Sequence, residues 1–159
     1  MGTATNIGLI VLAVVAIALV MSVVAKLALH LMKRPLEDRI AAHYDPDEVL
    51  MKDIAAMSFG LESKGVWQGR GNGGLVLTGD YLHFFRFVPG LDLRVPLRAI
   101  TELTFTKSHL GKATIYDLLK VRFFVDGHTD SIALYLTDPK GWKNRIEELM
   151  AGLPARERH

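Results

Sequence analysis

The clearest structural signal in the chain is Leu119-Lys-Val-Arg-Phe-Phe-Val-Asp-Gly-His-Thr-Asp-Ser-Ile-Ala-Leu-Tyr-Leu136. Large apolar residues occupy alternate positions before the Asp126-Gly127 pair and again from Ile132 onward, and such a pair favours a tight turn. A period of two places alternate side chains on one face of a β-strand. These residues therefore predict an antiparallel hairpin with one buried face.

Similar short segments extend upstream as far as Gly65, and turn residues separate them. The glycine-rich run 71–74 predicts a hairpin turn, residues 108–112 predict a loop, and further turns are expected at Gly79-Asp80 and Pro89-Gly90. Between them the pattern predicts strands at residues 75–78, 81–88, 91–97 and 100–105. The whole β-rich region is expected to hold about six or seven antiparallel strands.

Two helices are predicted outside these strands. Asp138-Pro139 suits a helix start, and the segment that follows carries one apolar face made of Trp142, Ile146, Leu149 and Met150. A shorter helix is predicted near residues 46–57, because Asp45 and Glu48 form a capping-box pattern. Its apolar face would consist of Leu50, Ile54 and Met57.

Together these elements predict an α+β domain over residues 62–151, followed by a disordered tail over 152–159. Its centre would be a strongly bent antiparallel β-sheet in the form of a partly open barrel. The C-terminal helix would cap the open end, because its apolar face needs a layer to cover. Residues 35–61 are expected to be a linker that contains the short helix.

The N-terminal segment is different, because residues 7–25 contain no charged side chain. About 20 apolar residues suffice to cross a hydrocarbon core of about 30 Å, so residues 1–34 predict an N-terminal transmembrane α-helix. A cleavable signal peptide fits less well, since residues 1–6 hold no cation and the apolar run is too long. A buried core helix is the other alternative, but such helices are usually amphipathic.

The cations beside this segment predict its orientation. They all lie on the C-terminal side, at Lys26, Lys33, Arg34 and Arg39, and basic flanks stay in the cytoplasm. A single-pass protein of the cell membrane is therefore expected, with its N-terminus outside and its C-terminal domain in the cytoplasm. The absence of cysteine fits a reducing compartment.

Composition and spacing argue against several classes of function. The net charge of only +2 lacks the strong cationic field that nucleic-acid binding needs. An aromatic group is interpreted as packed core rather than as a base-stacking platform, and it comprises Trp67, Tyr81, Phe84, Phe85 and Phe87. The histidines His83, His109 and His128 are scattered, so no metal site, cofactor or catalytic centre is expected.

The order of segments resembles a pleckstrin-homology-like (PH-like) domain of the GRAM or bacterial PH kind. The resemblance covers about residues 62–151 and depends on strand patterns at 74–78, 82–85, 94–100 and 121–125, followed by the Trp142 helix. It implies a binding module for lipid headgroups, peptides or protein surfaces. Lipid-binding members often carry several cations in the first hairpin loop, whereas the loop 68–73 here has only Arg70.

The candidate ligand or partner site combines two polar segments. Arg70 and Asn72 lie in a glycine-rich run whose backbone N–H groups are able to bind an anion, although a plain turn is favoured. Lys107, His109 and Lys112 form a partly cationic loop, for which ordinary solvation is the simpler interpretation. The two segments form one site only if the fold brings them together.

The favoured prediction is a membrane-anchored PH-like binding or scaffolding module with a protein partner. A sensor of an anionic lipid headgroup or a small phosphate ligand is the alternative, using Arg70 and the loop 107–112. An enzyme with an unrecognised site is the third hypothesis, and it would require a deep pocket with titratable groups of perturbed pKa.

Overall fold

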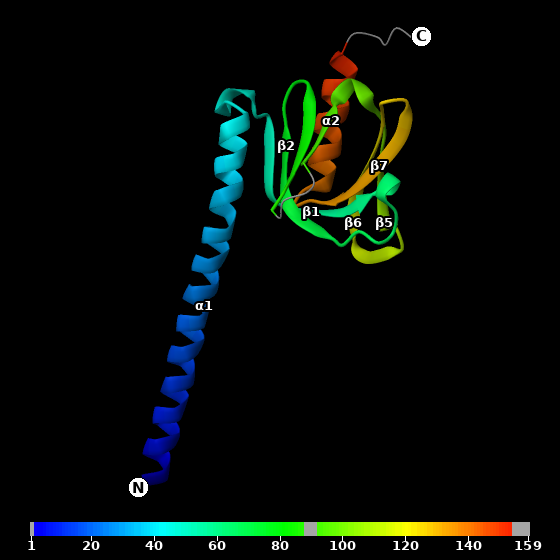
Figure 1. Cartoon of the computed structure of the whole chain (residues 1–159). Helices are drawn as coiled ribbons and strands as arrows, with labels where there is room; N and C mark the ends of the chain where they lie inside the picture. The colour runs from blue at the N-terminus through cyan, green and yellow to red at the C-terminus, as the bar shows by residue number, and fades with distance from the viewer. Residues whose placement is uncertain (1, 88–91, 154–159) are drawn as a thin grey trace.

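Figure 1 shows a computed structural model of the chain, which describes the backbone of residues 2–87 and 92–153 and the side chains there except those of 2–11, 25 and 27–35. The predicted turn at Pro89-Gly90 and residues 154–159 of the predicted disordered tail 152–159 lie outside these residues, while Gly152 belongs to the last helix. Two α-helices flank the β-strands, α1 (Gly2–His43) and α2 (Pro139–Gly152). The strands are β1 (Met51–Leu61), β2 (Gly71–Leu77), β3 (Tyr81–Arg86), β4 (Asp92–Pro96), β5 (Ile100–His109), β6 (Lys112–Val125) and β7 (His128–Tyr135). Short 3-10 turns are η1 (Pro46–Glu48), η2 (Glu62–Lys64) and η3 (Leu97–Ala99).

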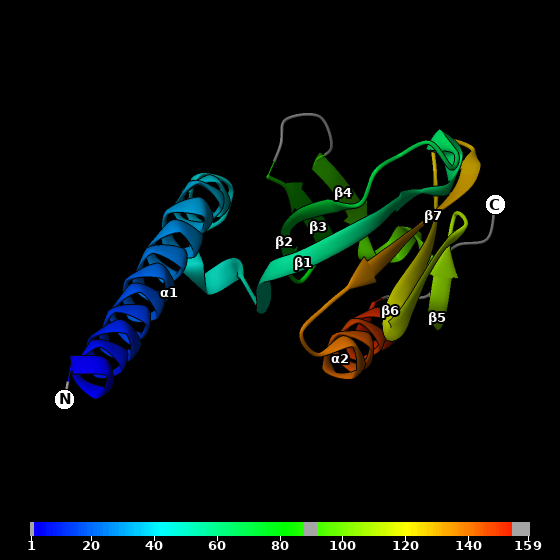
Figure 2. The ribbon, with the colours of Figure 1, turned by 90° about the horizontal axis from the view of Figure 1, so that it is seen from below.

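The seven strands form one antiparallel sheet in the order β4-β3-β2-β1-β7-β6-β5. β1 lies at the centre and joins the β2–β4 half to the β5–β7 half. Its register shifts between Asp53 and Ala56 and again between Ser58 and Leu61, and such bulges bend a strand. Figure 2 shows the resulting curvature, with both halves of the sheet folded around α2.

The first bulge of β1 is held by a buried carboxylate. Asp53 accepts a hydrogen bond of 2.8 Å from the Ala55 N–H, within the bulge. It accepts another of 2.7 Å from the Thr137 N–H, just after β7. The bend in the sheet is therefore linked directly to the segment that leads into α2.

The main core lies between the concave face of the sheet and α2. Trp142 and Ile146 of the helix are 3% and 0% exposed, and they pack against buried residues from β1 to β7. The Asp138 side chain accepts a hydrogen bond of 3.0 Å from the Gly141 N–H and so caps the first turn of the helix. The expected strand number, strand polarity and terminal helix are thus present in the structure.

The helix predicted near residues 46–57 is wrong, because β1 occupies most of that range. Only η1 is helical, and there the capping box between Asp45 and Glu48 is present. The residues that follow pair with β2, where Met51 faces Leu77 and Ala56 faces Gly73. Long-range pairing at the centre of a sheet outweighs a local period of three and four.

The turn predicted at residues 71–74 is also wrong, since all four residues belong to β2. The glycines among them serve close packing rather than chain reversal. A Cβ atom on Gly73 would lie 2.1 Å from the Phe85 carbonyl oxygen, and one on Gly74 would lie 2.8 Å from Leu36 Cδ2. The second contact shows that the glycines make room for α1.

The last turns of α1 pack on the outer face of β2 and β3. Leu36, Ile40 and Tyr44 are buried there against Val76 and Phe85. A side-chain contact supports this apolar packing, because both oxygens of Asp92 accept hydrogen bonds of 2.8 Å from Arg39 Nη2. The helix does not end at Pro35 as expected, but continues to His43 and becomes part of the domain.

The predicted transmembrane anchor over residues 1–34 is wrong: within the part of the chain that the structure describes, no helix is long and apolar enough to cross a membrane. α1 runs without a break from this N-terminal segment into the turns that contact the domain. These turns carry Glu37, Asp38 and Arg39 and lie on the domain. The expected single-pass topology, external N-terminus and cytoplasmic domain, and the membrane-anchored function built on them, are therefore contradicted.

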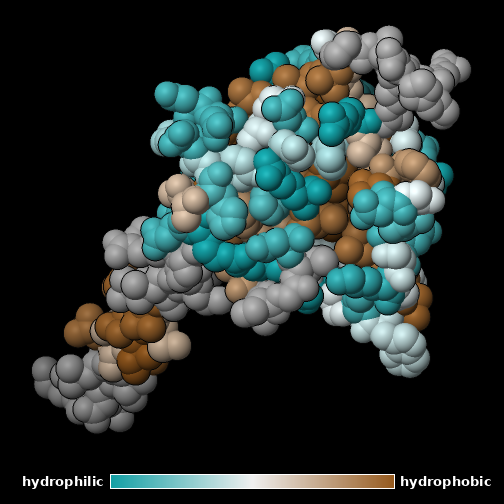
Figure 3. All heavy atoms as spheres, turned by 45° about the horizontal axis from the view of Figure 1, so that its top comes forward, coloured by the Kyte–Doolittle hydropathy of each residue, from teal (hydrophilic) through white to brown (hydrophobic). Residues whose placement is uncertain are grey.

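Residues 12–24 of α1 are uncovered in the structure, and Figure 3 shows them as an apolar band. Their large side chains, among them Leu12, Ile17 and Val23, are 50% to 67% exposed. Exposed apolar patches of this kind favour association in water. We therefore expect the full chain to self-associate in detergent-free buffer, as measured by light scattering.

A triple variant tests the role of this band. Changing Val14, Ile17 and Met21 to glutamine places polar groups along one face of the helix and should lower the associated mass. The matched control changes the same three residues to leucine and should associate like the parent chain. Equal masses for the glutamine and leucine variants would show that the band does not drive association.

His83 lies beneath the end of α1 and is 5% exposed. Its Nδ1 atom is 2.9 Å from the Tyr44 hydroxyl, and its ring stacks on Phe85 with centroids 3.8 Å apart. Among the described residues, no group forms a hydrogen bond with His83 Nε2. Burial, the largest cause, lowers the pKa of His83 from 6.5 to about 4, against an opposing effect of Asp92.

This pKa predicts a loss of stability on acidification. Between pH 6.5 and pH 4 the unfolded chain binds a proton at this histidine and the folded chain does not, so the free energy of unfolding falls as pH falls. The expected contribution is about 2 kcal/mol between pH 7 and pH 5. Urea unfolding at the two pH values should show a smaller difference for His83→Gln than for the parent chain, whereas identical pH dependence would contradict this assignment.

Candidate functional site

The hairpin of β5 and β6 extends past the rest of the sheet and folds back over β1. The β6–β7 pairing stops at Leu119 and Leu134, while β5 and β6 remain paired to the turn at Leu110-Gly111. Near this turn, His109 Nε2 lies 3.1 Å from the Gly60 carbonyl oxygen. Lys112 Nζ donates a hydrogen bond of 3.1 Å to the Phe59 carbonyl oxygen. The tip of the hairpin is therefore attached to the end of β1.

Arg70 reaches the same place from the β1–β2 loop. Its Nη2 atom donates a hydrogen bond of 3.1 Å to the Ala113 carbonyl oxygen, and its guanidinium carbon lies 4.7 Å from the centre of the Phe59 ring. We call Phe59, Gly60, Arg70, His109 and Lys112 the hairpin junction. Three of the five site residues predicted from the sequence, Arg70, His109 and Lys112, therefore meet in the structure.

The other two predicted residues lie outside the hairpin junction. Asn72 is an exposed residue of β2, opposite Met57, and its carbonyl oxygen accepts a hydrogen bond of 3.0 Å from the Phe87 N–H. Lys107 is an exposed residue of β5. In the described part of the chain, neither side chain forms a hydrogen bond or ion pair with the junction.

The electrostatics of the hairpin junction suit a structural contact better than an anion cradle. Burial, the largest cause, lowers the pKa of His109, while its bond to the Gly60 carbonyl opposes the shift. The ring is therefore neutral at pH 7. Arg70 and Lys112 each use a donor on a backbone carbonyl, which leaves only part of their hydrogen-bonding capacity for a ligand.

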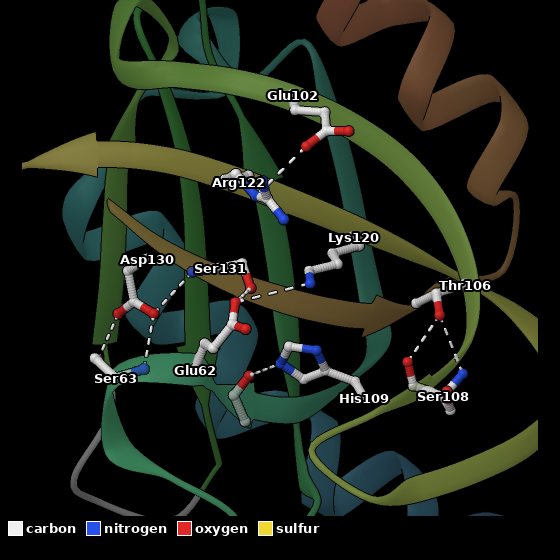
Figure 4. Close-up of polar contacts among 11 residues, drawn as sticks. Glu62, Ser63, Glu102, Thr106, Ser108, His109, Lys120, Arg122, Asp130 and Ser131 are labelled. Atoms are coloured by element: carbon white, nitrogen blue, oxygen red, sulfur yellow. Dashed lines mark hydrogen bonds and ion pairs between the residues drawn. The ribbon is translucent and has the colours of Figure 1, made fainter. Parts of the chain in front are cut away.

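A polar network lies beside the junction on β6, β7 and η2, as Figure 4 shows. The Ser131 hydroxyl donates to the Glu62 carboxylate, and Lys120 Nζ lies 3.7 Å from the same group. The hydrogen bond from Ser131 is the largest cause that lowers the pKa of Glu62, and the charge of Lys120 adds to it. Burial opposes this shift. Asp130 accepts hydrogen bonds of 2.9 Å and 2.5 Å from the Ser63 N–H and hydroxyl.

This network holds η2, and its two serine hydroxyls are bound by carboxylates. Ser63 and Ser131 each donate to a carboxylate rather than to a histidine, so the network lacks the nucleophile–base–orienter order of acyl transfer. Within the described residues, no three His, Cys, Asp or Glu side chains group as metal ligands. The sequence did not predict this network, because its residues come from η2, β6 and β7, which are far apart along the chain.

The β1–β2 loop is shaped by one glutamine. Gln68 Oε1 accepts a hydrogen bond of 3.0 Å from the Leu61 N–H, and Gln68 Nε2 donates to the Leu61 and Gly65 carbonyl oxygens. The loop between Leu61 and Gln68 projects outward, and Trp67 in this loop is 96% exposed. The sequence-based placement of Trp67 in the core is therefore wrong.

The β5–β6 hairpin also carries exposed apolar side chains. Ile115 is 81% exposed and Tyr116 is 55% exposed, two and three positions after Ala113. The hydrogen bond from Arg70 to the Ala113 carbonyl oxygen joins the β1–β2 loop to this hairpin. Figure 1 shows the loop passing beside the hairpin. We call Val66, Trp67, Arg70, Ile115 and Tyr116 the Trp67 surface.

Comparison with known proteins bears on the fold. No protein-family model matches the chain, and a search of curated proteins finds no match. A chain of the solved structure "The 8S snRNP Assembly Intermediate" is similar at 9% identity and a TM-score of 0.54, over 72% of this chain and 91% of that one. The C-terminal domain of an unknown protein from Leishmania infantum matches at 10% identity and a TM-score of 0.47, over 65% and 84% of the two chains. The first likeness supports a shared fold alone.

Replacing Gln68 tests how the loop is held. Gln68→Ala removes the acceptor of the Leu61 N–H and both donors, so we expect faster hydrogen exchange at Leu61 and residues 65–70. The free energy of unfolding should fall by about 1–2 kcal/mol. Lys64→Ala, at an exposed position of η2, is the matched control and should leave Leu61 protected. Unchanged exchange in Gln68→Ala would contradict this role.

Proposed function

We propose that the β-rich domain is a PH-like module that binds a protein partner through the Trp67 surface. The bent antiparallel sheet with one C-terminal helix supports the resemblance, and the exposed loop supports the position of the site. The proposal does not depend on a membrane anchor, because the surface is built from the β1–β2 loop and the β5–β6 hairpin alone.

The exposure of Trp67 is the observation that carries the proposal. An indole at 96% exposure leaves apolar area in water, and here Gln68 holds the loop that presents it. Tryptophan, tyrosine and arginine are the side chains most enriched in binding hot spots, where truncation commonly costs about 2 kcal/mol or more. The Trp67 surface has one of each, at Trp67, Tyr116 and Arg70.

A protein fits this surface better than an anionic lipid headgroup. Recognition of a phosphate requires several converging cationic donors. In the described region His109 is neutral, Arg70 and Lys112 share donors with backbone carbonyls, and Glu62 is ionised. The expected partner therefore offers an apolar pocket for the indole and a carboxylate for the remaining donors of Arg70.

Site-specific photo-crosslinking tests the proposal. A photoreactive phenylalanine in place of Trp67 should give a discrete protein adduct in cells that make the chain. The same group at Lys140, an exposed position on α2, is the matched control and should not give that adduct. Identical adducts from the two positions, or vesicle binding that depends on Trp67 without any protein adduct, would overturn the proposal.

The identified partner allows a quantitative measurement. Trp67→Ala should weaken its binding about 30-fold, which corresponds to about 2 kcal/mol. Glu148→Ala on α2 should leave affinity unchanged. Neither change should alter the melting temperature, since both side chains are exposed.

A further inference from the structure

A polar cavity lies away from the Trp67 surface, where the end of α1 meets the sheet. It has a volume of about 410 Å³, within the range of about 300–1,000 Å³ that small-molecule sites occupy. Its walls come from the last turn of α1, from η1, from the β2–β3 turn and from β4. No residue of this cavity belongs to the Trp67 surface.

Arg94 supplies the positive charge of this cavity. Its guanidinium carbon lies 3.7 Å from the centre of the Tyr81 ring and 5.9 Å from that of Tyr44. Stacking on Tyr81 uses the flat face of the guanidinium, and a hydrogen bond to the Tyr44 side chain uses one donor, which leaves the other edge donors for a ligand. No carboxylate among the described residues forms an ion pair with Arg94. Such an edge matches the two oxygens of a carboxylate.

Two carboxylates supply the opposite charge. Asp47 of η1 and Asp80 of the β2–β3 turn both line the cavity. Glu48 also lines it, but the Asp45 N–H donates to the Glu48 carboxylate at 3.2 Å. In contrast, neither the Asp47 nor the Asp80 carboxylate forms an ion pair with a described residue. The cavity therefore presents separate acceptors for an ammonium group and a donor for a carboxylate.

We propose that this cavity binds a small zwitterion that carries a carboxylate and an ammonium group, such as a free amino acid. Arg94 binds the carboxylate, Asp80 and Asp47 bind the ammonium group, and the rings of Tyr44 and Tyr81 flank the body of the ligand. Because the walls come from both α1 and the sheet, the bound ligand also holds the end of the helix against the domain.

Thermal unfolding of the full chain with each common free amino acid at millimolar concentration tests the proposal. At least one should raise the melting temperature in a dose-dependent way and slow hydrogen exchange at residues 43–48 and 78–81. For that amino acid, the analogue without the ammonium group and the analogue without the carboxylate should each bind about tenfold more weakly or worse.

Variants assign the two ends of the ligand. Arg94→Lys should weaken binding about tenfold by removing the paired donors, and Asp80→Asn should weaken it by removing the charge that binds the ammonium group. Arg98→Lys, at an exposed position of η3 outside the cavity, is the matched control. Absence of any amino-acid response, or equal binding of an analogue that lacks either charged group, would overturn the proposal.

Discussion

The attachment of the β5–β6 hairpin to the end of β1 is the contact on which the candidate site depends. Three side chains, Arg70, His109 and Lys112, make this contact with the backbone or ring of a neighbouring segment. Gly60 allows it, because its φ of 107° suits glycine and a Cβ there would lie 3.1 Å from Leu110 Cδ1. Without the attachment, the β1–β2 loop and the hairpin would be two separate solvated segments.

The central strand explains why two unrelated surfaces occur on one small domain. β1 pairs with both halves of the sheet, and its two bulges turn the halves toward α2. Its C-terminal end leads into the loop of the Trp67 surface. Its N-terminal end comes directly after η1, which forms one wall of the cavity that Arg94 lines. A ligand in the cavity and a partner on the Trp67 surface therefore act on opposite ends of the same strand.

The sequence predicted an element correctly where its pattern of apolar residues matches the face that the element buries in the fold. Alternation located β7 and residues 119–125 of β6, and the spacing of apolar residues located the terminal helix, because each has one face on the core. It failed at β1, where central pairing overrode the helical spacing of Ile54 and Met57, and at Gly73, whose role is a close approach to Phe85. The anchor was inferred from apolar residues alone, without the packing of Leu36, Ile40 and Tyr44 that makes α1 part of the domain.

The candidate site was only partly predictable for a similar reason. The sequence shows the polar residues Arg70, His109 and Lys112. Their contact depends on a hairpin that folds back over β1, and no local pattern predicts that fold. Trp67 was misplaced because an aromatic residue near a strand is normally core. The most direct measurement of the hairpin junction is the nuclear Overhauser effect between the Arg70 side chain and the Phe59 ring in the full chain. The account predicts a strong effect and ring-current-shifted Arg70 protons, whereas random-coil shifts without contacts from the β1–β2 loop to the hairpin would contradict it.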